Sequence, residues 1–288
     1  GMRRVGKSVI MRLLIERLID RGVSGANILY INKESLVFDA IKDYRDLYRY
    51  AVDYFKNGAA RGAARGASAP ASVTTAAAAP ASATGRTYIL IDEVQEIAGW
   101  ERAVASFLAD GLGDVVISGS NATLLSSELA TLLSGRYVEI PVYPLTFREF
   151  LTFRNAKRDG GDRTDTAAEA ENEFKNYLRY GGLPGIHQLP ANDDVLFSYL
   201  NAVLNTILYK DVITRHKIRD ASIFDKLVRY LFDNVGNITT AKRIADYFKS
   251  QRIRTSVDTI LNYISYVEAS LLIDKAPRYD IKGKRLLE

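Results

Sequence analysis

The first eight residues have the composition and spacing of a phosphate-binding loop. The run GMRRVGKS at residues 1–8 matches the pattern G-x-x-x-x-G-K-[ST] at every fixed position. In such a loop the backbone amides face phosphate oxygens, and the helix that follows adds the positive end of its dipole. The alternative is a chance match, which the position of the motif directly before an amphipathic helix disfavours. We predict that the following residues bind ATP: Gly1, Arg4, Val5, Gly6, Lys7 and Ser8.

Two side chains of this loop would act directly on the nucleotide and its metal. Lys7 would reach the β- and γ-phosphates, and the Ser8 hydroxyl would ligate Mg²⁺. A second run supplies the acidic partner, because four apolar residues at 88–91 end in Asp92 and Glu93. We predict that Asp92 organises Mg²⁺ and that Glu93 polarises the attacking water as a general base. Such a strand end is common by itself, but behind a phosphate-binding loop it indicates an ATPase.

Two further positions are candidates for a catalytic role. Ser120 and Asn121 follow the next apolar run, 114–117, and the carboxyl ends of parallel strands line the ligand crevice. Asn121 would contact the γ-phosphate or the attacking water, unless it caps the next helix instead. Arg136 would sense ATP or act as an arginine finger on a neighbour, unless it is an ordinary surface ion-pair residue. The sequence leaves these alternatives open.

The elements that would position these residues alternate between helices and strands. Periodic apolar residues predict helices at 7–20, 39–55, 100–108 and 124–133, and short apolar runs predict strands at 28–31, 88–91, 114–117 and 137–140. This alternation implies a parallel sheet covered by helices on both faces, which is an α/β fold of three layers. We expect it to form an ATPase domain over residues 1–153.

One segment inside this domain differs sharply in composition. Residues 57–85 contain 13 alanines, and their only large apolar residue is Val73. Such a segment buries too little apolar surface to offset the entropy of ordering it, and glycines and prolines interrupt the alanines. We expect a disordered insertion between two elements of one domain rather than a domain boundary.

The second half of the chain is expected to be mainly helical. Apolar periodicity predicts helices at 168–180, 195–214, 221–234, 240–250 and 256–269. Two apolar runs near the C-terminus, 271–274 and 279–286, predict a hairpin.

The chain resembles the P-loop ATPases of the AAA+ superfamily that are found in archaea and bacteria. The resemblance covers nearly the whole chain outside the Ala-rich insertion, and its motifs are GxRRxGKS at 1–8, LIDEVQEI at 90–97, SGSN at 118–121, LLSGR at 132–136, PLTFREF at 144–150, YGGLP at 180–184 and YDIKGK at 279–284. It implies an ATPase core, a helical region and a winged helix. In that family a strand directly precedes the P-loop, and a restriction-nuclease-like domain usually follows the winged helix. Since this sequence begins at Gly1 and ends at Glu288, we expect both to be absent.

We therefore divide the second half into a helical region, 154–220, and a winged-helix domain, 221–288. In a winged helix the second helix would enter the major groove of DNA, with Arg252, Arg254 and Lys282 near phosphates. The alternative is a winged helix that contacts only proteins. Asp258 on the face of the second helix keeps that alternative open.

Composition excludes several other classes of site. The chain has no cysteine and two histidines, which excludes disulfides, thiol nucleophiles and cysteine-bound zinc and leaves little for a histidine-based metal site. No membrane span or signal peptide is visible, so we expect a cytoplasmic protein. The net charge of +5 is uneven, because residues 201–288 hold 16 Lys and Arg against 10 Asp and Glu. This excess suits either a polyanionic partner or a solvated basic face.

These features predict a Mg²⁺-dependent ATPase that couples its nucleotide state to a winged helix, with ATP and Mg²⁺ as ligands and DNA as a candidate partner. One alternative is a non-enzymatic DNA-binding regulator with a vestigial nucleotide site. Another is a scaffold whose winged helix recruits a protein. The oligomeric state stays open.

Overall fold

The computed structural model describes residues 2–63, 85–119, 133, 135–157 and 167–276. The chain divides into two compact units. One comprises Gly6–Val142, and the other comprises Gly1–Val5 together with Tyr143–Glu288. The division between Val5 and Gly6 therefore falls inside the phosphate-binding loop.

The unit of residues 6–142 is built around a parallel sheet with the strand order β1-β2-β3. Its strands are β1 (Ile28–Asn32), β2 (Tyr88–Asp92) and β3 (Asp114–Ile117). Tyr88 of the central strand pairs with Ile28 on one side and with Asp114 on the other. The same register places Asn32 beside Asp92, so the strands end together at one edge of the sheet.

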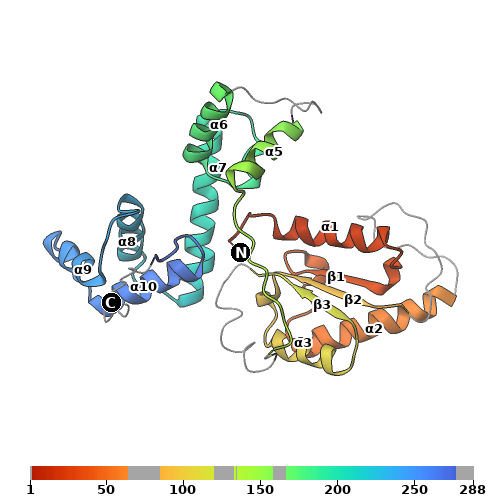
Figure 1. Cartoon of the computed structure of the whole chain (residues 1–288). Coiled ribbons are helices and arrows are strands. Elements are labelled where there is room, and N and C mark those ends of the chain that lie inside the picture. The colour runs from red at the N-terminus through yellow and green to blue at the C-terminus, as the bar shows by residue number, and fades with distance from the viewer. Residues whose placement is uncertain (1, 64–84, 120–132, 134, 158–166, 277–288) are drawn as a thin grey trace, which may run out of the picture. The chain divides into compact units, whose positions relative to one another are not determined.

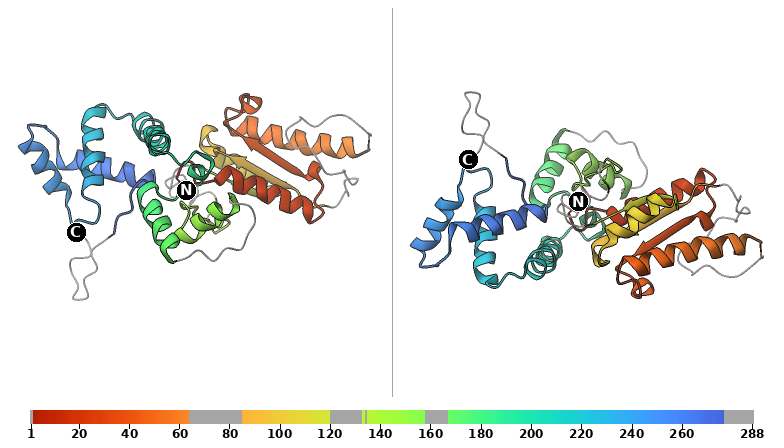
Figure 2. Two further views of the ribbon diagram at one scale, coloured as in Figure 1. Left: turned by 90° about the horizontal axis from the view of Figure 1, so that it is seen from above. Right: turned by 90° about the horizontal axis from the view of Figure 1, so that it is seen from below.

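Helices cover both faces of this sheet, as the alternation of elements predicts (Figure 1 and Figure 2). They are α1 (Lys7–Asp20), α2 (Tyr44–Ala63) and α3 (Trp100–Ala109). On one face Met11 of α1 packs with Ile28 and Leu90. On the other face α2 and α3 pack against the alternate strand residues in a larger core, which contains Leu29, Ile31, Ile89, Ile91, Leu47, Ala51, Ala103, Val104 and Phe107. The three-layer α/β arrangement is thereby confirmed for this unit.

The connection between α1 and β1 sets the direction of the first helix. Only a short segment with a 3₁₀ turn, Gly25–Asn27, lies between the end of α1 and the start of β1. Because α1 packs on the sheet, it must run antiparallel to the strands. Its N-terminus therefore lies at the edge where the strands end (Figure 1).

The described part of the second unit is helical. Its helices are α5 (Phe147–Lys157), α6 (Ala167–Tyr180), α7 (Asp193–Thr206), α8 (Ala221–Asp233), α9 (Ala241–Ser250) and α10 (Val257–Ala269), with a 3₁₀ helix η5 (Pro184–Gln188) and a π-helix η6 (Ile207–Thr214). Side-chain caps fix several helix starts, since Asp220, Thr240 and Ser256 accept hydrogen bonds from backbone amides of α8, α9 and α10.

Two apolar cores hold the last helices of this unit together. In the first, Leu208 and Val212 of η6 pack with Phe224, Val228 and Val267. In the second, the buried residues of α8, α9 and α10 meet, and they are Leu227, Ile244, Ala245, Phe248 and Ile260.

The structure corrects four expectations about elements. Residues 137–140 form no strand, and the side chains of Val138 and Ile140 are exposed. Helix α2 runs on to Ala63, into the segment predicted as a loop, because alanine favours helix more than the two glycines in this stretch oppose it. Helix α5 was not anticipated. Residues 271–274 form a turn and irregular chain instead of a strand.

Several predictions fall on residues outside the described part of the chain. They are the remainder of the Ala-rich insertion, most of the helix expected at 124–133 and the strand expected at 279–286.

Candidate functional site

The backbone of the phosphate-binding loop turns through two left-handed residues, Arg4 at φ 64° and Gly6 at φ 100°. Gly6 is the N-cap of α1, and its carbonyl accepts a hydrogen bond of 2.9 Å from the amide of Ile10. A Cβ built on Gly6 would meet no atom within 4 Å. Glycine is therefore required here for its backbone conformation rather than for space.

Lys7 and Ser8 occupy the first turn of α1, and both side chains are half-buried. Gly6 has no side chain that could cap this end of the helix, and the first turn of α1 contains no acidic residue. The amides of a first helical turn have no partner within the helix and attract anions. This helix start, at the edge where the strands end, therefore suits a phosphate group.

Asp92 ends the central strand and is 1% exposed. Two hydroxyls donate to its carboxylate: Ser118, directly after β3, to one oxygen, and Tyr30 of β1 to the other at 3.3 Å. Burial and the negative charge of Asp92 raise the pKa of Tyr30, so its hydroxyl keeps its proton and remains a donor. These contacts fix the orientation of the Asp92 carboxylate.

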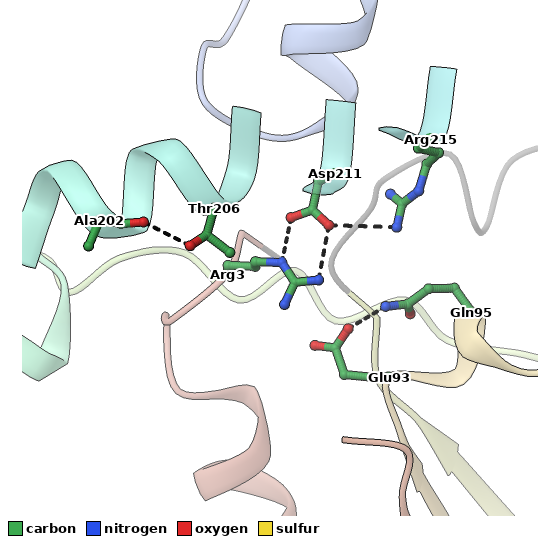
Figure 3. A network of polar contacts seen from close by, with 7 residues as sticks. All are labelled: Arg3, Glu93, Gln95, Ala202, Thr206, Asp211 and Arg215. Carbon is green, nitrogen blue, oxygen red and sulfur yellow. Dashed lines mark hydrogen bonds and ion pairs between the residues drawn. The ribbon is translucent and has the colours of Figure 1, made fainter. Parts of the chain in front are cut away.

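Glu93 follows at the carboxyl end of β2 in a left-handed conformation with φ 55°. Its amide donates to the Ser118 hydroxyl at 3.4 Å, and the side-chain amide of Gln95 donates to its carboxylate (Figure 3). A positive φ is uncommon for a non-glycine residue and costs backbone energy. Here this conformation turns the chain at Glu93 out of the strand direction. The residue is 7% exposed.

Sequence reasoning missed the side chains that hold these two carboxylates. Ser118 lies in the SGSN motif, but only the later residues of that motif were proposed as candidates. Tyr30 and Gln95 carry no motif signal, because their role depends on strand register and on a turn. Asp92, Glu93 and Ser118 are brought together as neighbouring strand ends.

The remaining predicted residues have different positions. Arg136 is exposed, and its amide donates to the carbonyl of Leu133 at 2.9 Å. Gly1, Ser120, Asn121 and Lys282 lie outside the described residues. The structure therefore does not test a catalytic role for Asn121 or Arg136.

Arg252 and Arg254 lie in the connection between α9 and α10, and both are exposed. Arg252 has φ 60°, and its amide donates to the carbonyl of Lys249 at 3.0 Å. Helix α10 itself contains no Lys or Arg, so positive charge flanks this helix rather than lining it.

The donor set at the end of β2 suits Mg²⁺ held largely through water. Asp92 offers carboxylate oxygens, and Ser8 offers a hydroxyl at the start of α1, both of which are hard ligands that Mg²⁺ prefers. Among the described residues no group of three or more His, Cys, Asp and Glu could enclose a metal by itself. A magnesium ion in such a site takes further ligands from water and from nucleotide phosphates.

Comparisons with known proteins connect this arrangement to a family. Residues 1–151 match the family described as an AAA domain, and residues 171–287 match a domain of unknown function. An uncharacterized protein of Haemophilus influenzae is 34% identical over 288 residues, which are 100% of this chain and 64% of the relative. Uncharacterized protein MJ1544 of Methanocaldococcus jannaschii is 30% identical over 198 residues, which are 69% of this chain and 44% of the relative. The chain thus spans less than two thirds of the length of these relatives.

Among solved structures, the Aeropyrum pernix ORC1 protein in complex with DNA aligns with a TM-score of 0.37 and 14% identity, covering 94% of this chain and 76% of that one. Within the part of the chain that the structure describes, no helix combines the length and apolar character needed to cross a membrane.

Proposed function

Since the chain belongs to the family of AAA domains, we propose that it binds ATP with Mg²⁺ and hydrolyses it, using Gly6, Lys7, Ser8, Asp92 and Glu93. One observation carries the proposal. The start of α1, which has Lys7 and Ser8 and no side-chain cap, lies at the same edge of the sheet as the buried carboxylates at the end of β2. A cationic, amide-rich helix start beside two carboxylates suits a polyphosphate and its magnesium ion.

The two carboxylates would have different roles because their surroundings differ. Asp92 accepts hydrogen bonds from two hydroxyls and would hold the water shell of Mg²⁺ in place. Bound Mg²⁺ would neutralise charge on the phosphate oxygens. Glu93 lies one residue further along and would accept a proton from the attacking water. Gln95 holds the Glu93 carboxylate by one hydrogen bond and thereby orients it.

The test separates binding from hydrolysis. Glu93→Gln removes the proton acceptor but keeps the size of the side chain, so we expect ATP affinity within about threefold of the parent. Single-turnover hydrolysis should fall by roughly 10² or more, the usual contribution of a general base. Glu96→Gln is the matched control, because Glu96 is an exposed glutamate of the same 3₁₀ turn, Val94–Glu96. Hydrolysis at the parent rate in Glu93→Gln would remove Glu93 from the mechanism.

We propose DNA as a second ligand, bound through the helix pair α9–α10, which would form the helical part of a winged helix. The observation that favours it is a group of exposed cations on α9 and in the turn after it: Lys242, Arg243, Lys249, Arg252 and Arg254. Only two acidic residues, Asp246 and Asp258, lie in these two helices before Glu268. Nucleotide-dependent DNA binding would then couple the two activities.

A further inference from the structure

The second unit contains a buried carboxylate that the proposed chemistry does not use. Asp211 lies in the π-helix η6, which continues directly from α7, and it is 3% exposed. Its neighbours Leu208 and Val212 belong to the apolar core that η6 shares with α8 and α10. A carboxylate in such surroundings remains charged only if it is paired and hydrogen-bonded.

The partner of this carboxylate comes from the other end of the chain. Arg3 donates from Nε to one oxygen of Asp211 at 2.6 Å and from Nη2 to the other at 3.0 Å (Figure 3). Arg215, one turn further along the same segment, adds a second guanidinium at 3.7 Å. The Arg3 side chain is itself only 10% exposed. Two parallel hydrogen bonds from one guanidinium fix both distance and orientation.

The general P-loop pattern G-x-x-x-x-G-K-[ST] leaves the position of Arg3 variable, so that pattern assigns Arg3 no role. The next residue, Arg4, already has the left-handed backbone that turns the loop. Arg3 and Asp211 belong to the same compact unit, whereas Gly6 and Lys7 belong to the other. The ion pair therefore anchors the loop at Arg3. From there the chain continues to Gly6 and Lys7.

We propose that Asp211 is a positioning residue for nucleotide binding: it holds Arg3, and through Arg3 the backbone of the phosphate-binding loop, in the conformation that receives phosphate. The π-helix is consistent with this assignment, because π-helical turns within helices are rare and frequently lie at functional sites. By linkage, a nucleotide that tightens the loop also stabilises η6 and the core around it. The inference rests on the proposed nucleotide site.

The test is a double-mutant cycle on the full 288-residue chain, with affinity for a non-hydrolysable ATP analogue and Mg²⁺ as the readout. Asp211→Asn and Arg3→Ala should each weaken binding roughly tenfold, and the double variant should weaken it no further, since both act through one contact. Arg3→Lys keeps the charge but loses the paired donors, so it should recover part of the affinity. Asp225→Asn is the control, because it breaks the exposed Arg229–Asp225 pair of 2.9 Å and should not alter binding.

Hydrogen exchange of residues 207–228, with and without the analogue, supplies a second readout. The parent should gain protection from exchange when it binds the analogue, and Arg3→Ala should not. The Arg3→Ala variant also provides the test if Asp211→Asn fails to fold. Additive losses in the cycle, or unchanged protection in a parent that binds the analogue, would overturn the inference and leave the ATPase proposal standing. A parent that binds no nucleotide would overturn both.

Discussion

At the scale of single residues, the end of β2 places two adjacent carboxylates in different environments. Asp92 is completely enclosed and receives hydroxyl donors from β1 and from the residue after β3. Glu93 is turned out of the strand by its left-handed backbone and receives an amide donor from a nearby turn. This difference fits the roles proposed above, in which Asp92 holds Mg²⁺ and Glu93 accepts a proton from the attacking water.

Lys7→Ala tests the phosphate contact. Lys7 begins α1 and is half-buried, and its predicted partner is the nucleotide. Loss of a charge-assisted hydrogen bond should weaken ATP binding by roughly a hundredfold, with the free energy of unfolding changed by less than about 1 kcal/mol. Isothermal titration and urea unfolding measure the two quantities. Lys56→Ala, at an exposed site of α2, should bind ATP as the parent does, and equal affinities for both variants would contradict the assignment.

The environment of His216 leads us to expect that the stability of the protein depends on pH. Its ring stacks on Tyr266 with centroids 3.8 Å apart, and burial, followed by the charge of Arg215, lowers the pKa of His216 from its ordinary 6.5. The unfolded chain therefore binds a proton on His216 at a higher pH than the folded chain does. The contribution of neutral His216 to the free energy of unfolding is fully present above pH 6.5 and is lost as the pH falls below that value. Urea unfolding at about pH 7.5 and 5.5 should show a smaller loss in His216→Gln than in the parent. Equal losses would contradict the prediction.

The residues proposed for the nucleotide site, Lys7, Ser8, Asp92 and Glu93, could be named from the sequence, because they lie in motifs whose spacing reflects their chemistry. Their roles stay predictions. The tertiary contacts that support the site could not be predicted from the sequence. Tyr30 reaches Asp92 only through the register of two strands, and Arg3 meets Asp211 across 208 positions of sequence. Contacts of that kind depend on tertiary packing, which no local pattern encodes.

At the scale of elements, the sequence predicts helices and strands correctly where the apolar pattern is strong. It fails where tertiary burial determines whether a segment forms an element. The paired strands at 28–32, 88–92 and 114–117 lie where the apolar runs predicted them. The run at 137–140 has the same apolar, β-favouring composition but forms no strand, since β-propensity requires a neighbouring strand to pack against. Helix α2 ends later than predicted because alanine sustains it.

Replacing residues 64–84 with a short Gly/Ser loop tests how far the insertion contributes to the fold. Its composition offers almost no apolar surface, and stability depends only weakly on loop length, so the free energy of unfolding should change by less than about 1 kcal/mol. Replacing residues 57–84 also removes the last turns of α2 and should cost more. Thermal and urea unfolding of the two variants provide the comparison. A large loss of unfolding free energy on replacing residues 64–84 alone would show that the insertion packs against the domain.

At the scale of the whole molecule, charge separates the two halves of the chain. Residues 201–288 carry 16 Lys and Arg against 10 Asp and Glu within a net charge of +5 for the whole chain. Residues 1–200 are therefore nearly neutral, and the positive charge belongs to the segment that contains α8, α9 and α10. An excess of this kind fits the proposed DNA partner, and it fits a solvated basic face equally well.

Replacing Arg252, Arg254 and Lys282 together by alanine tests the DNA proposal. If these cations contact phosphates, the variant should bind duplexes of any sequence more weakly, and the slope of log affinity against log salt should flatten by roughly 0.9 per lost contact. Titration of a labelled duplex at two salt concentrations measures both effects. A parent chain that fails to bind DNA at low salt would leave the ATPase proposal alone and favour a protein-contacting role for this module.

The register of the parallel sheet also sets the order in which its strands can assemble. Tyr88 pairs with Asp114, whereas its pairing with Ile28 joins positions more than twice as far apart along the chain. Because distant pairings slow folding, β2 and β3 should associate with α3 first, and β1 should join later. Truncating Val115 should then mainly slow refolding, and truncating Leu29 should mainly speed unfolding. Shortening the insertion should accelerate the late step without changing the early one.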